Sequence, residues 1–270
     1  MRNRLVWGLF LLGAWQALVA CDAQNVAAGG ALAAQALTIT AADERRMGEQ
    51  TKQQVLQDTP RLEQEALQTY LAELGTAIVS TSEPSGRAFE WHVVVSDEVN
   101  AFAAPGGFVF VTTGALKLMQ NEAQLVGVLG HEVAHVVRSH SLQGIRQALL
   151  AQGVVTGVLG AEPDKLAELG AKVASSLILK HNDRAFELES DLWGADAAHA
   201  LGYDPRELAA FLLILSRQAG EPPKWASWFF DHPGTPERIA ALEAHVASRG
   251  WNLSATRQDA ARFRARIAGL

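Results

Sequence analysis

The segment VLGHEVAHVVRSH, residues 128–140, constrains the fold most, because its histidines and glutamate have a spacing that a helix uses. At about 100° per residue, His131 and His135 lie one turn apart on one side of a helix. Apolar residues gather on the other side and predict a core face: Leu125, Val126, Leu129, Val133, Val136 and Val137. We therefore predict an amphipathic helix over residues 121–142 that presents two imidazoles.

Two imidazoles at this spacing can each direct a nitrogen at one zinc ion. Glu132 lies on the flank of the pair, where its carboxylate can reach a water beside the metal without binding the metal. The chain has 8 His, so the pattern would arise by chance in roughly one such chain in a hundred. A third ligand is needed to support the zinc site.

Residues 183–205 predict a second helix, which supplies the candidate third ligand. Glu187 and Asp191 are four residues apart and therefore share one face. The same face carries small residues that would let this helix approach the first one closely: Ser190, Gly194 and Ala198. The alternative is an acidic face in solvent. Glu189 points about 160° away from Glu187 and is predicted to face solvent.

His140 is the nearest other candidate ligand, and the helical phase argues against it. Along the same helix it lies about 180° from His131, on the core face. Arg138 and Ser141 occupy the places where a metzincin pattern needs a glycine and a histidine. We expect His140 to be a packed or capping residue.

Residues 1–20 predict a lipoprotein signal peptide. Arg2 and Arg4 precede an apolar run that is short for a membrane-spanning helix of about 20 residues. The run ends in LVAC, which resembles the bacterial lipobox and implies that Cys21, the single cysteine, becomes lipidated after cleavage. An uncleaved anchor and ordinary secretion are the alternatives.

Residues 21–39 are rich in alanine and glycine and predict a tether, which leaves residues 40–270 as the metallopeptidase domain. A lipid anchor implies a bacterial cell-envelope protein that faces the periplasm. Asp22 after the cysteine favours the inner membrane, with the outer membrane as the alternative.

The composition fits one sizeable core, because 49% of the 270 residues are hydrophobic and 19% are charged. The net charge is -6 and no dense Lys/Arg run is present. Nucleic acid is therefore not expected as a partner, since binding phosphates needs a concentrated basic surface.

Strand patterns are confined to the middle of the chain. Residues 89–96 alternate, and residues 100–114 predict two short strands joined around Pro105. Helical patterns precede them from Thr40, and they continue from Leu116 to the end. The predicted class is α+β, mainly helical, with a small β-sheet beside the zinc helix.

Four segments in this order resemble one protein family: NAFAAPGGFVFVTTGAL, GHEVAH, the ExxxD of Glu187 and Asp191, and DHPGTPERI. GHEVAH with a downstream ExxxD resembles the gluzincin metallopeptidases, in which that glutamate is the third ligand. The whole set is similar to the HtpX-like and CAAX-prenyl-protease family, and among its members to the periplasmic lipoproteins, over roughly residues 40–245. Its integral-membrane members carry several spanning helices, so the substrates of this chain are expected to differ.

The resemblance implies a zincin-like fold and a zinc-dependent endopeptidase. His131, His135 and Glu187 would bind one Zn²⁺, and Glu132 would act as general base towards the attacking water. Asp191 would hydrogen-bond a zinc-binding imidazole, with His131 the expected partner. The expected substrates are misfolded or unassembled cell-envelope proteins.

One of the two strands before the zinc helix is expected to be an edge against which an extended substrate pairs. The candidate substrate-binding residues are Asn100, Ala101, Phe102 and Ala103. Core strands joined by a tight turn are the alternative, in which Asn100 is a turn former.

His232 lies in DHPGTPERI, just after an aromatic cluster. It could cap the next helix at the surface, or donate a hydrogen bond to the oxyanion of the reaction. It could also take the open zinc position and hold the enzyme latent. The resemblance implies a histidine from this segment near the metal.

Two other classes of function compete with the endopeptidase. A zinc-containing chaperone or assembly factor would need no general base, so Glu132 argues against it. A small-peptide or ester hydrolase would need a closed pocket for a free amino terminus, and no motif for one is present.

Overall fold

The computed structural model describes residues 30, 39–82, 86–159, 184–218, 232 and 236–270. Cys21, the predicted signal peptide and most of the predicted tether lie outside these described residues. The chain divides into two compact units, which are Met1–Thr40 with Gln143–Leu177, and Ala41–Leu142 with Ile178–Leu270.

The first unit contains most of helix α6 (His140–Leu159), which belongs to it from Gln143 onward. Within this unit the Arg146 guanidinium donates to the carbonyl oxygen of Ile39 at 3.0 Å. In the part of the chain that the structure describes, no helix is long and apolar enough to cross a membrane.

The second unit is built around a three-stranded sheet of β1 (Glu90–Val94), β2 (Ala101–Ala104) and β3 (Phe108–Thr112), in the order β1-β3-β2. β2 and β3 form the predicted antiparallel hairpin, and β1 runs parallel to β3. Gly106 and Gly107 form the turn with φ of 75° and 92°, values that glycine adopts at little cost. The prediction of strands in this region is confirmed.

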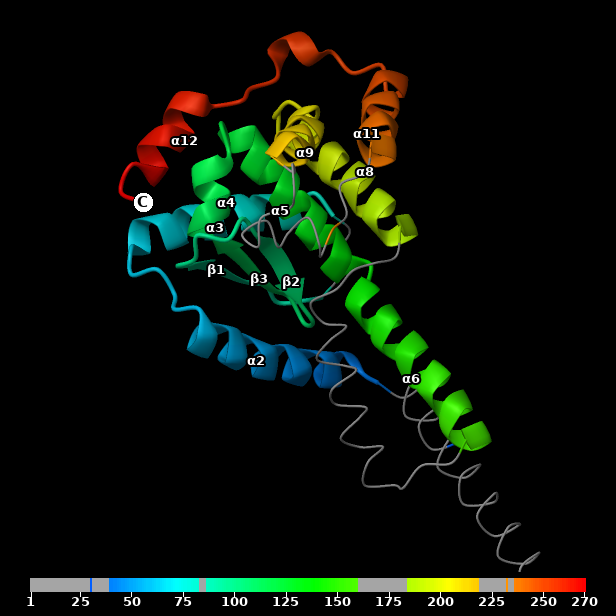
Figure 1. Ribbon diagram of the computed structural model, residues 1–270. Coiled ribbons are helices and arrows are strands. Elements are labelled where there is room, and N and C mark those ends of the chain that lie inside the picture. Colours follow the sequence, from blue (N-terminus) through cyan, green and yellow to red (C-terminus); the bar gives the residue numbers. More distant parts are fainter. Residues whose placement is uncertain (1–29, 31–38, 83–85, 160–183, 219–231, 233–235) are drawn as a thin grey trace, which may run out of the picture. The chain divides into compact units, whose positions relative to one another are not determined.

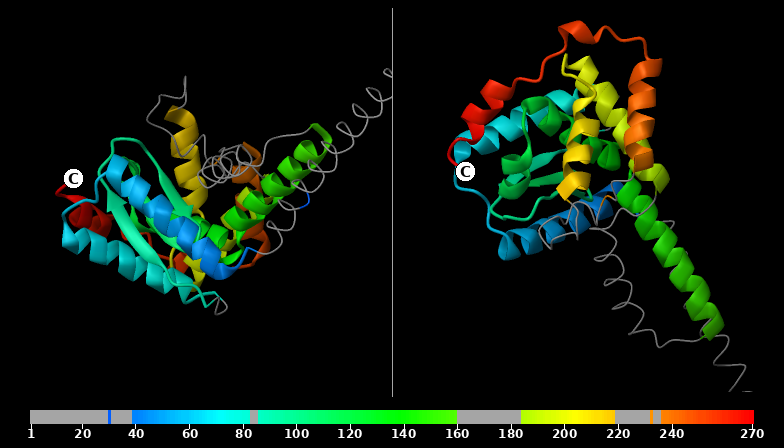
Figure 2. Two further views of the ribbon diagram at one scale, coloured as in Figure 1. Left: turned by 90° about the horizontal axis from the view of Figure 1, so that it is seen from below. Right: turned by 45° about the horizontal axis from the view of Figure 1, so that its top comes forward.

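The two faces of the sheet have different coverings (Figure 1). Val109 and Val111 belong to the core, where α3 (Glu65–Val79) and α5 (Glu122–Val137) pack against the sheet. Successive side chains of a strand point to opposite faces, so Phe108 faces the other way, towards α2 (Ala41–Asp58). The Arg45 guanidinium lies 3.8 Å from the Phe108 ring centre, and α2 runs along this face of the sheet in both figures (Figure 2).

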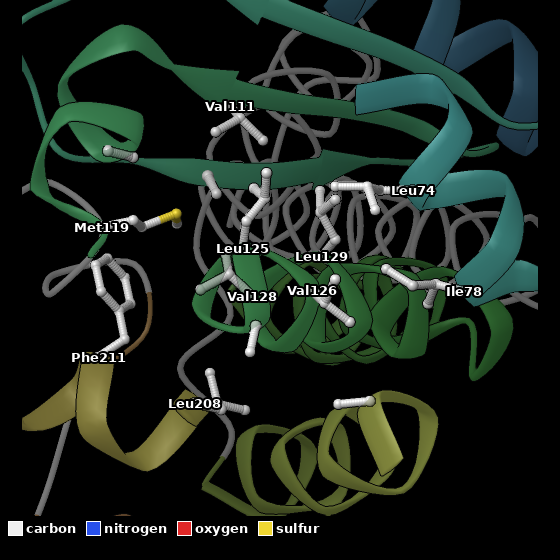
Figure 3. Close-up of a cluster of buried hydrophobic side chains, with 14 of the residues drawn as sticks. Leu74, Ile78, Val111, Met119, Leu125, Val126, Val128, Leu129, Leu208 and Phe211 are labelled. Atoms are coloured by element: carbon white, nitrogen blue, oxygen red, sulfur yellow. The ribbon is translucent and has the colours of Figure 1, made fainter. Parts of the chain in front are cut away.

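Helix α5 is the centre of the core. The Asn121 side chain caps its start by accepting from the backbone N–H of Gln124 at 2.9 Å. Figure 3 shows Leu125 and Leu129 on the side of the sheet and Leu208, from α9 (Glu207–Gln218), on the opposite side. Every residue from Glu122 to Val136 is buried. The prediction of one buried face was therefore wrong, because a second helical layer covers the histidine side.

That second layer begins with α8 (Arg184–Ala200), which contacts α5 through glycines. A Cβ atom added to Gly194 would lie 3.0 Å from the carbonyl oxygen of Gly127 and 3.0 Å from the backbone nitrogen of His131. One added to Gly130 would lie 2.9 Å from the Cα of Gly194. The prediction that small residues allow a close approach is confirmed, and this approach brings Glu187 to the histidines.

Helix α5 ends earlier than the sequence pattern predicts. Arg138 is its C-cap, and Ser139 has the left-handed φ of 59°, so a new helix, α6, begins at His140. The Arg87 guanidinium donates to the Ser139 hydroxyl at 2.7 Å and also pairs with Glu44 of α2. Because the helix breaks here, the helical phase no longer predicts where His140 lies.

The remaining elements are α4 (Thr113–Leu118), α11 (Pro236–Ser248), a 3₁₀ turn at Leu253–Ala255 and α12 (Ala260–Ile267). α12 returns to the start of α5, where the buried carboxylate of Glu122 accepts from the Tyr70 hydroxyl at 2.6 Å and pairs with Arg262. The fold is α+β and mainly helical, as predicted, with the small sheet beside α5.

Candidate metal centre

Four buried side chains converge beside α5. His131 and His135 come from α5, Glu187 comes from α8, and His232 precedes α11. One possible ligand atom from each of these residues lies within 4.8 Å of the others. Among the described residues this is the one group of His, Cys, Asp or Glu that could hold a metal ion. The structure thus brings the three predicted ligands together with His232, for which the open zinc position was one of the expected places.

The spacing of these atoms fits a tetrahedral zinc ion. The Nε2 atoms of His131 and His135 are 3.0 Å apart, and His232 Nδ1 is 3.2 Å from His131 Nε2. Glu187 oxygens lie 3.4 Å from His135 Nε2 and 3.5 Å from His131 Nε2. Zinc–ligand bonds of about 2.0–2.1 Å place tetrahedral ligand atoms about 3.3–3.4 Å apart. The residues present therefore fit this metal.

The charges of the centre also favour a divalent cation. The buried carboxylates of Glu132, Glu187 and Asp191 surround a single buried guanidinium, that of Arg238. With neutral imidazoles, this group carries two excess negative charges, which a 2+ ion balances. Burial alone would lower the pKa of His131, yet the hydrogen bonds and charges of Asp191 and Glu187 raise that pKa to about 9. Without a metal, the centre attracts a proton instead.

Glu132 lies beside the ligand group and is not part of it. Its side chain is buried, and its Oε1 is 3.5 Å from Nε2 of His232. A carboxylate in this place can receive a proton from a water next to the ligand atoms. This is the place that a general base needs.

Asp191 lies behind His131, on the side away from the other ligands. Its Oδ1 is 2.9 Å from Nδ1 of His131. Because an ionised carboxylate only accepts hydrogen bonds, Nδ1 carries the proton and Nε2 keeps its lone pair for a metal. Burial opposes the charge of Asp191, but hydrogen bonds from Arg238 and His131 hold its pKa below the usual range.

Arg238 is a residue of this centre that the sequence analysis missed. Its Nε and Nη2 donate to the two oxygens of Asp191 at 2.7 Å each, and its Nη1 is 2.9 Å from Oε2 of Glu187. One guanidinium therefore holds the two acidic side chains that α8 directs towards this centre, Glu187 and Asp191. A signal was present in the sequence, because Arg238 follows His232 by six residues and the two acids lacked a cation.

His140 is not among the ligands, and the prediction of its place on the core face 180° from His131 was wrong. It is 1% exposed and lies next to His135, with 3.0 Å between their Nδ1 atoms. The left-handed turn at Ser139 causes the difference. Glu189 is 45% exposed, as predicted, and its carboxylate reaches His140 and Arg138.

The predicted substrate strand lies at an edge of the sheet, because β2 pairs with β3 on one side. The backbone N–H of Thr112 donates to the carbonyl of Asn100 at 3.0 Å, so Asn100 and Phe102 bond towards β3. Antiparallel pairing alternates, and the backbone groups of Ala101 and Ala103 consequently point to the other side, away from β3. A role of these residues in substrate binding stays a prediction.

His232 is described in the structure, but the aromatic and proline-rich residues before it are not. The cluster of Trp225, Trp228, Phe229 and Phe230 lies outside the described residues. His232 itself is fully buried, so the alternative in which it lies at the surface and caps the next helix is excluded.

Comparison with known proteins agrees with this geometry. The sequence model of peptidase family M48 matches residues 62–246. The beta-barrel assembly-enhancing protease of Yersinia pestis is 27% identical over 243 residues, which cover 86% of this chain and 50% of that protein. Metalloprotease LoiP of Escherichia coli is 26% identical over 85% of this chain and 90% of its own length. The chain spans about half the length of the beta-barrel assembly-enhancing proteases that it matches.

A mitochondrial protein is also similar. The metalloendopeptidase OMA1 of Bos taurus is 32% identical over 163 residues, which cover 56% of this chain and 31% of that protein. The matched residues 62–246 contain the two histidines, Glu187 and His232.

Proposed function

Because the chain belongs to peptidase family M48 and is a metalloendopeptidase, we propose that it cleaves misfolded or unassembled proteins of the bacterial cell envelope with one zinc ion. The observation that carries this proposal is the buried group of His131, His135 and Glu187 with the Glu132 carboxylate beside it. A purely structural zinc site would need no such base.

The chain's own residues divide the work of peptide hydrolysis. A zinc ion held by His131, His135 and Glu187 would supply Lewis acidity that activates water and polarises the scissile carbonyl. Glu132 accepts the proton of the attacking water and passes it to the leaving amine. Asp191 holds His131 in the tautomer that leaves Nε2 free for the metal.

The edge strand supports an extended, unfolded substrate. The backbone groups of Ala101 and Ala103 point away from β3, and we infer that a peptide pairs with them by main-chain hydrogen bonds, although both residues are buried in this structure. Main-chain pairing selects for an extended conformation more than for particular side chains. A protease with this preference would act on chains that have failed to fold or assemble.

The distribution of cleavage sites in unfolded casein tests the proposed function. We expect internal cleavage at many positions, because backbone pairing is insensitive to sequence, and mass spectrometry of the products shows it. Casein that stays intact but no longer aggregates would favour the chaperone or assembly factor. Trimming confined to the ends of casein, or to short peptides, would favour the small-peptide hydrolase.

Anchoring of the domain at the periplasmic face of a membrane is part of the same proposal, and LVAC supports it. Changing Cys21→Ser removes the thiol that a lipid would modify, so we expect an unprocessed or soluble protein. Labelled palmitate should enter the wild type and not the variant. Palmitate in the variant would contradict the lipobox interpretation, and fractionation of wild-type cells separates the inner membrane, favoured by Asp22, from the outer.

The position of His232 favours a latent resting state over oxyanion binding. Its Nδ1 lies 3.0 Å from both oxygens of Glu187 and 3.2 Å from Nε2 of His131. The nitrogen therefore belongs to the group of possible ligand atoms, and His232 could be a fourth zinc ligand beside His131, His135 and Glu187. A substrate would have to displace this imidazole before water can react.

His232→Ala is therefore expected to raise basal cleavage, or to remove a lag, in a single-turnover assay. His245→Ala is a matched control, because His245 lies on α11 and pairs with Asp196 outside the metal centre. A loss of about 10²–10³-fold in His232→Ala would instead indicate an oxyanion donor. Unchanged kinetics would contradict both roles.

A further inference from the structure

Both zinc-binding imidazoles of the proposed site have a hydrogen-bonding partner, and the two partners differ in kind. His131 faces the carboxylate of Asp191. His135 faces another imidazole, with its Nδ1 at 3.0 Å from Nδ1 of His140. The Nε2 of His135 points to the ligand group, 3.0 Å from Nε2 of His131. His135 thus uses one nitrogen for the metal site and the other for His140.

The proton positions follow from this arrangement. Two imidazole nitrogens 3.0 Å apart form a hydrogen bond when one carries a proton and the other a lone pair. His135 keeps the lone pair on Nε2 for a metal, so its Nδ1 carries the proton and donates to His140. His140 then carries its own proton on Nε2, which lies 3.3 Å from the Oε2 of Glu189. Each of these two hydrogen bonds, from His135 to His140 and from His140 to Glu189, then has one donor and one acceptor.

We propose that His140 is a positioning residue of the metal centre, which accepts a hydrogen bond from His135 and fixes the tautomer and ring orientation of that ligand. This inference rests on the proposed zinc site. It assigns His140 a role that the packing of an ordinary buried histidine would not require. It also gives Glu189 a role, as the last acceptor in the series of hydrogen bonds that runs from His135 through His140.

The surroundings hold His140 in place for this role. Its ring stacks on Phe186 of α8, with 4.2 Å between ring centres and 6° between planes. Its Nδ1 is also 3.4 Å from the Ser190 hydroxyl. The left-handed Ser139, held by the hydrogen bond from Arg87, ends α5 and turns the chain so that His140 lies against the last turn of the same helix.

A neutral partner on His135 suits the charge of the centre. Three buried carboxylates, those of Glu132, Glu187 and Asp191, already lie around Arg238 and the proposed zinc position. A fourth buried carboxylate in contact with His135 would have no cation to balance it, and burying an unpaired charge is costly. His140 accepts the same hydrogen bond without a charge. The negative group that follows, Glu189, is 45% exposed and pairs with Arg138 at 3.0 Å.

Two substitutions of His140 separate the hydrogen bond from packing. His140→Asn keeps an acceptor, because its amide oxygen can occupy the place of Nδ1, but it loses the ring that stacks on Phe186. His140→Phe keeps an aromatic ring against Phe186 but has no acceptor. The readouts are zinc affinity from competition with a chromophoric chelator, the visible spectrum of the Co²⁺-substituted protein, and thermal unfolding of the metal-free protein.

We expect His140→Phe to lose about 10–100-fold in zinc affinity, with a changed cobalt spectrum, because partners of metal-binding residues have effects of this size. His140→Asn should bind zinc more tightly than His140→Phe, even where its metal-free form melts lower. His199→Phe is a matched control, since His199 also stacks on an aromatic ring, that of Trp251 at 4.1 Å, away from the metal centre. Its zinc affinity should equal that of the wild type.

Two results would overturn the inference. One is wild-type zinc affinity and spectrum in His140→Phe. The other is zinc affinity that follows the thermal stability of the metal-free variants, with Asn weaker than Phe. Wild-type protein that binds zinc but leaves casein intact would overturn the proposed function and leave this test unaffected.

Discussion

Glu132→Gln is expected to retain its zinc and to lose about 10²–10⁴-fold of the peptide-cleavage rate, the usual contribution of general acid–base catalysis. The amide has nearly the shape of the carboxylate but cannot accept the proton of water. Glu132 is buried and lies outside the group of ligand atoms, so the metal should stay in place. Atomic absorption of the purified variant measures the metal, and casein cleavage measures the rate.

Two controls accompany this measurement. Glu73→Gln changes an exposed glutamate of α3 and should cleave casein at the wild-type rate. A chelator should abolish wild-type cleavage, and added zinc should restore it. Full turnover by Glu132→Gln would contradict the proposed mechanism, and loss of its zinc would show that Glu132 supports the metal instead.

Arg238→Met is expected to destabilise the metal-free protein by about 3–5 kcal/mol, the cost of breaking a buried ion pair by removing one partner. Methionine fills much of the space of the arginine stem, but Asp191 loses the two hydrogen bonds from Arg238 and Glu187 loses its guanidinium partner. Urea unfolding in the presence of a chelator measures the loss. Arg238→Lys should recover part of it, because lysine keeps the charge but cannot form the bidentate contact.

The pH dependence of this loss has a definite sign. The pKa of the Asp191 carboxyl is held low by Arg238 and His131 against the effect of burial. A carboxyl with a lowered folded-state pKa contributes stability above its unfolded pKa of about 3.9 and loses it as the pH falls. The difference between wild type and Arg238→Met should therefore be present at pH 7 and shrink below about pH 4.

Arg249→Met is the matched control for Arg238→Met. Arg249 follows the same helix, α11, but pairs with Asp196 at the surface, where its side chain is 44% exposed. Exposed ion pairs contribute about 0–1 kcal/mol. An equal loss of stability in both variants would contradict the special role of the buried pair.

Residues within one helix were predictable from spacing alone. The 3.6-residue period places His131 and His135 on one side of α5, and the same period gives Glu187 and Asp191 one face of α8. The hairpin of β2 and β3 follows equally from local signals, since alternating apolar residues flank Gly106 and Gly107. These relations depend only on residues close together in the sequence, because helices and strands have the same regular geometry in every fold.

The helical phase failed where the backbone left the helix. Ser139 turns left-handed, in a position that the Arg87 guanidinium supports from outside the helix. Serine has no intrinsic preference for this conformation, so nothing in the segment itself predicted the break. His140 consequently lies beside His135 and not on the opposite face.

The sequence by itself determined the chemistry of this protein, that is, two imidazoles one turn apart, a neighbouring carboxylate and a third ligand on another helix. Asp191 was also expected beside His131, and only the tertiary structure decided that Arg238 and His140 lie next to these groups. The guanidinium of Arg238 reaches Asp191 and Glu187 because α11 packs on α8. Such contacts join residues that are 47 or more positions apart in the chain. Their formation depends on the packing of whole helices, so the sequence could indicate that Glu187 and Asp191 lack a cation but not that Arg238 supplies it.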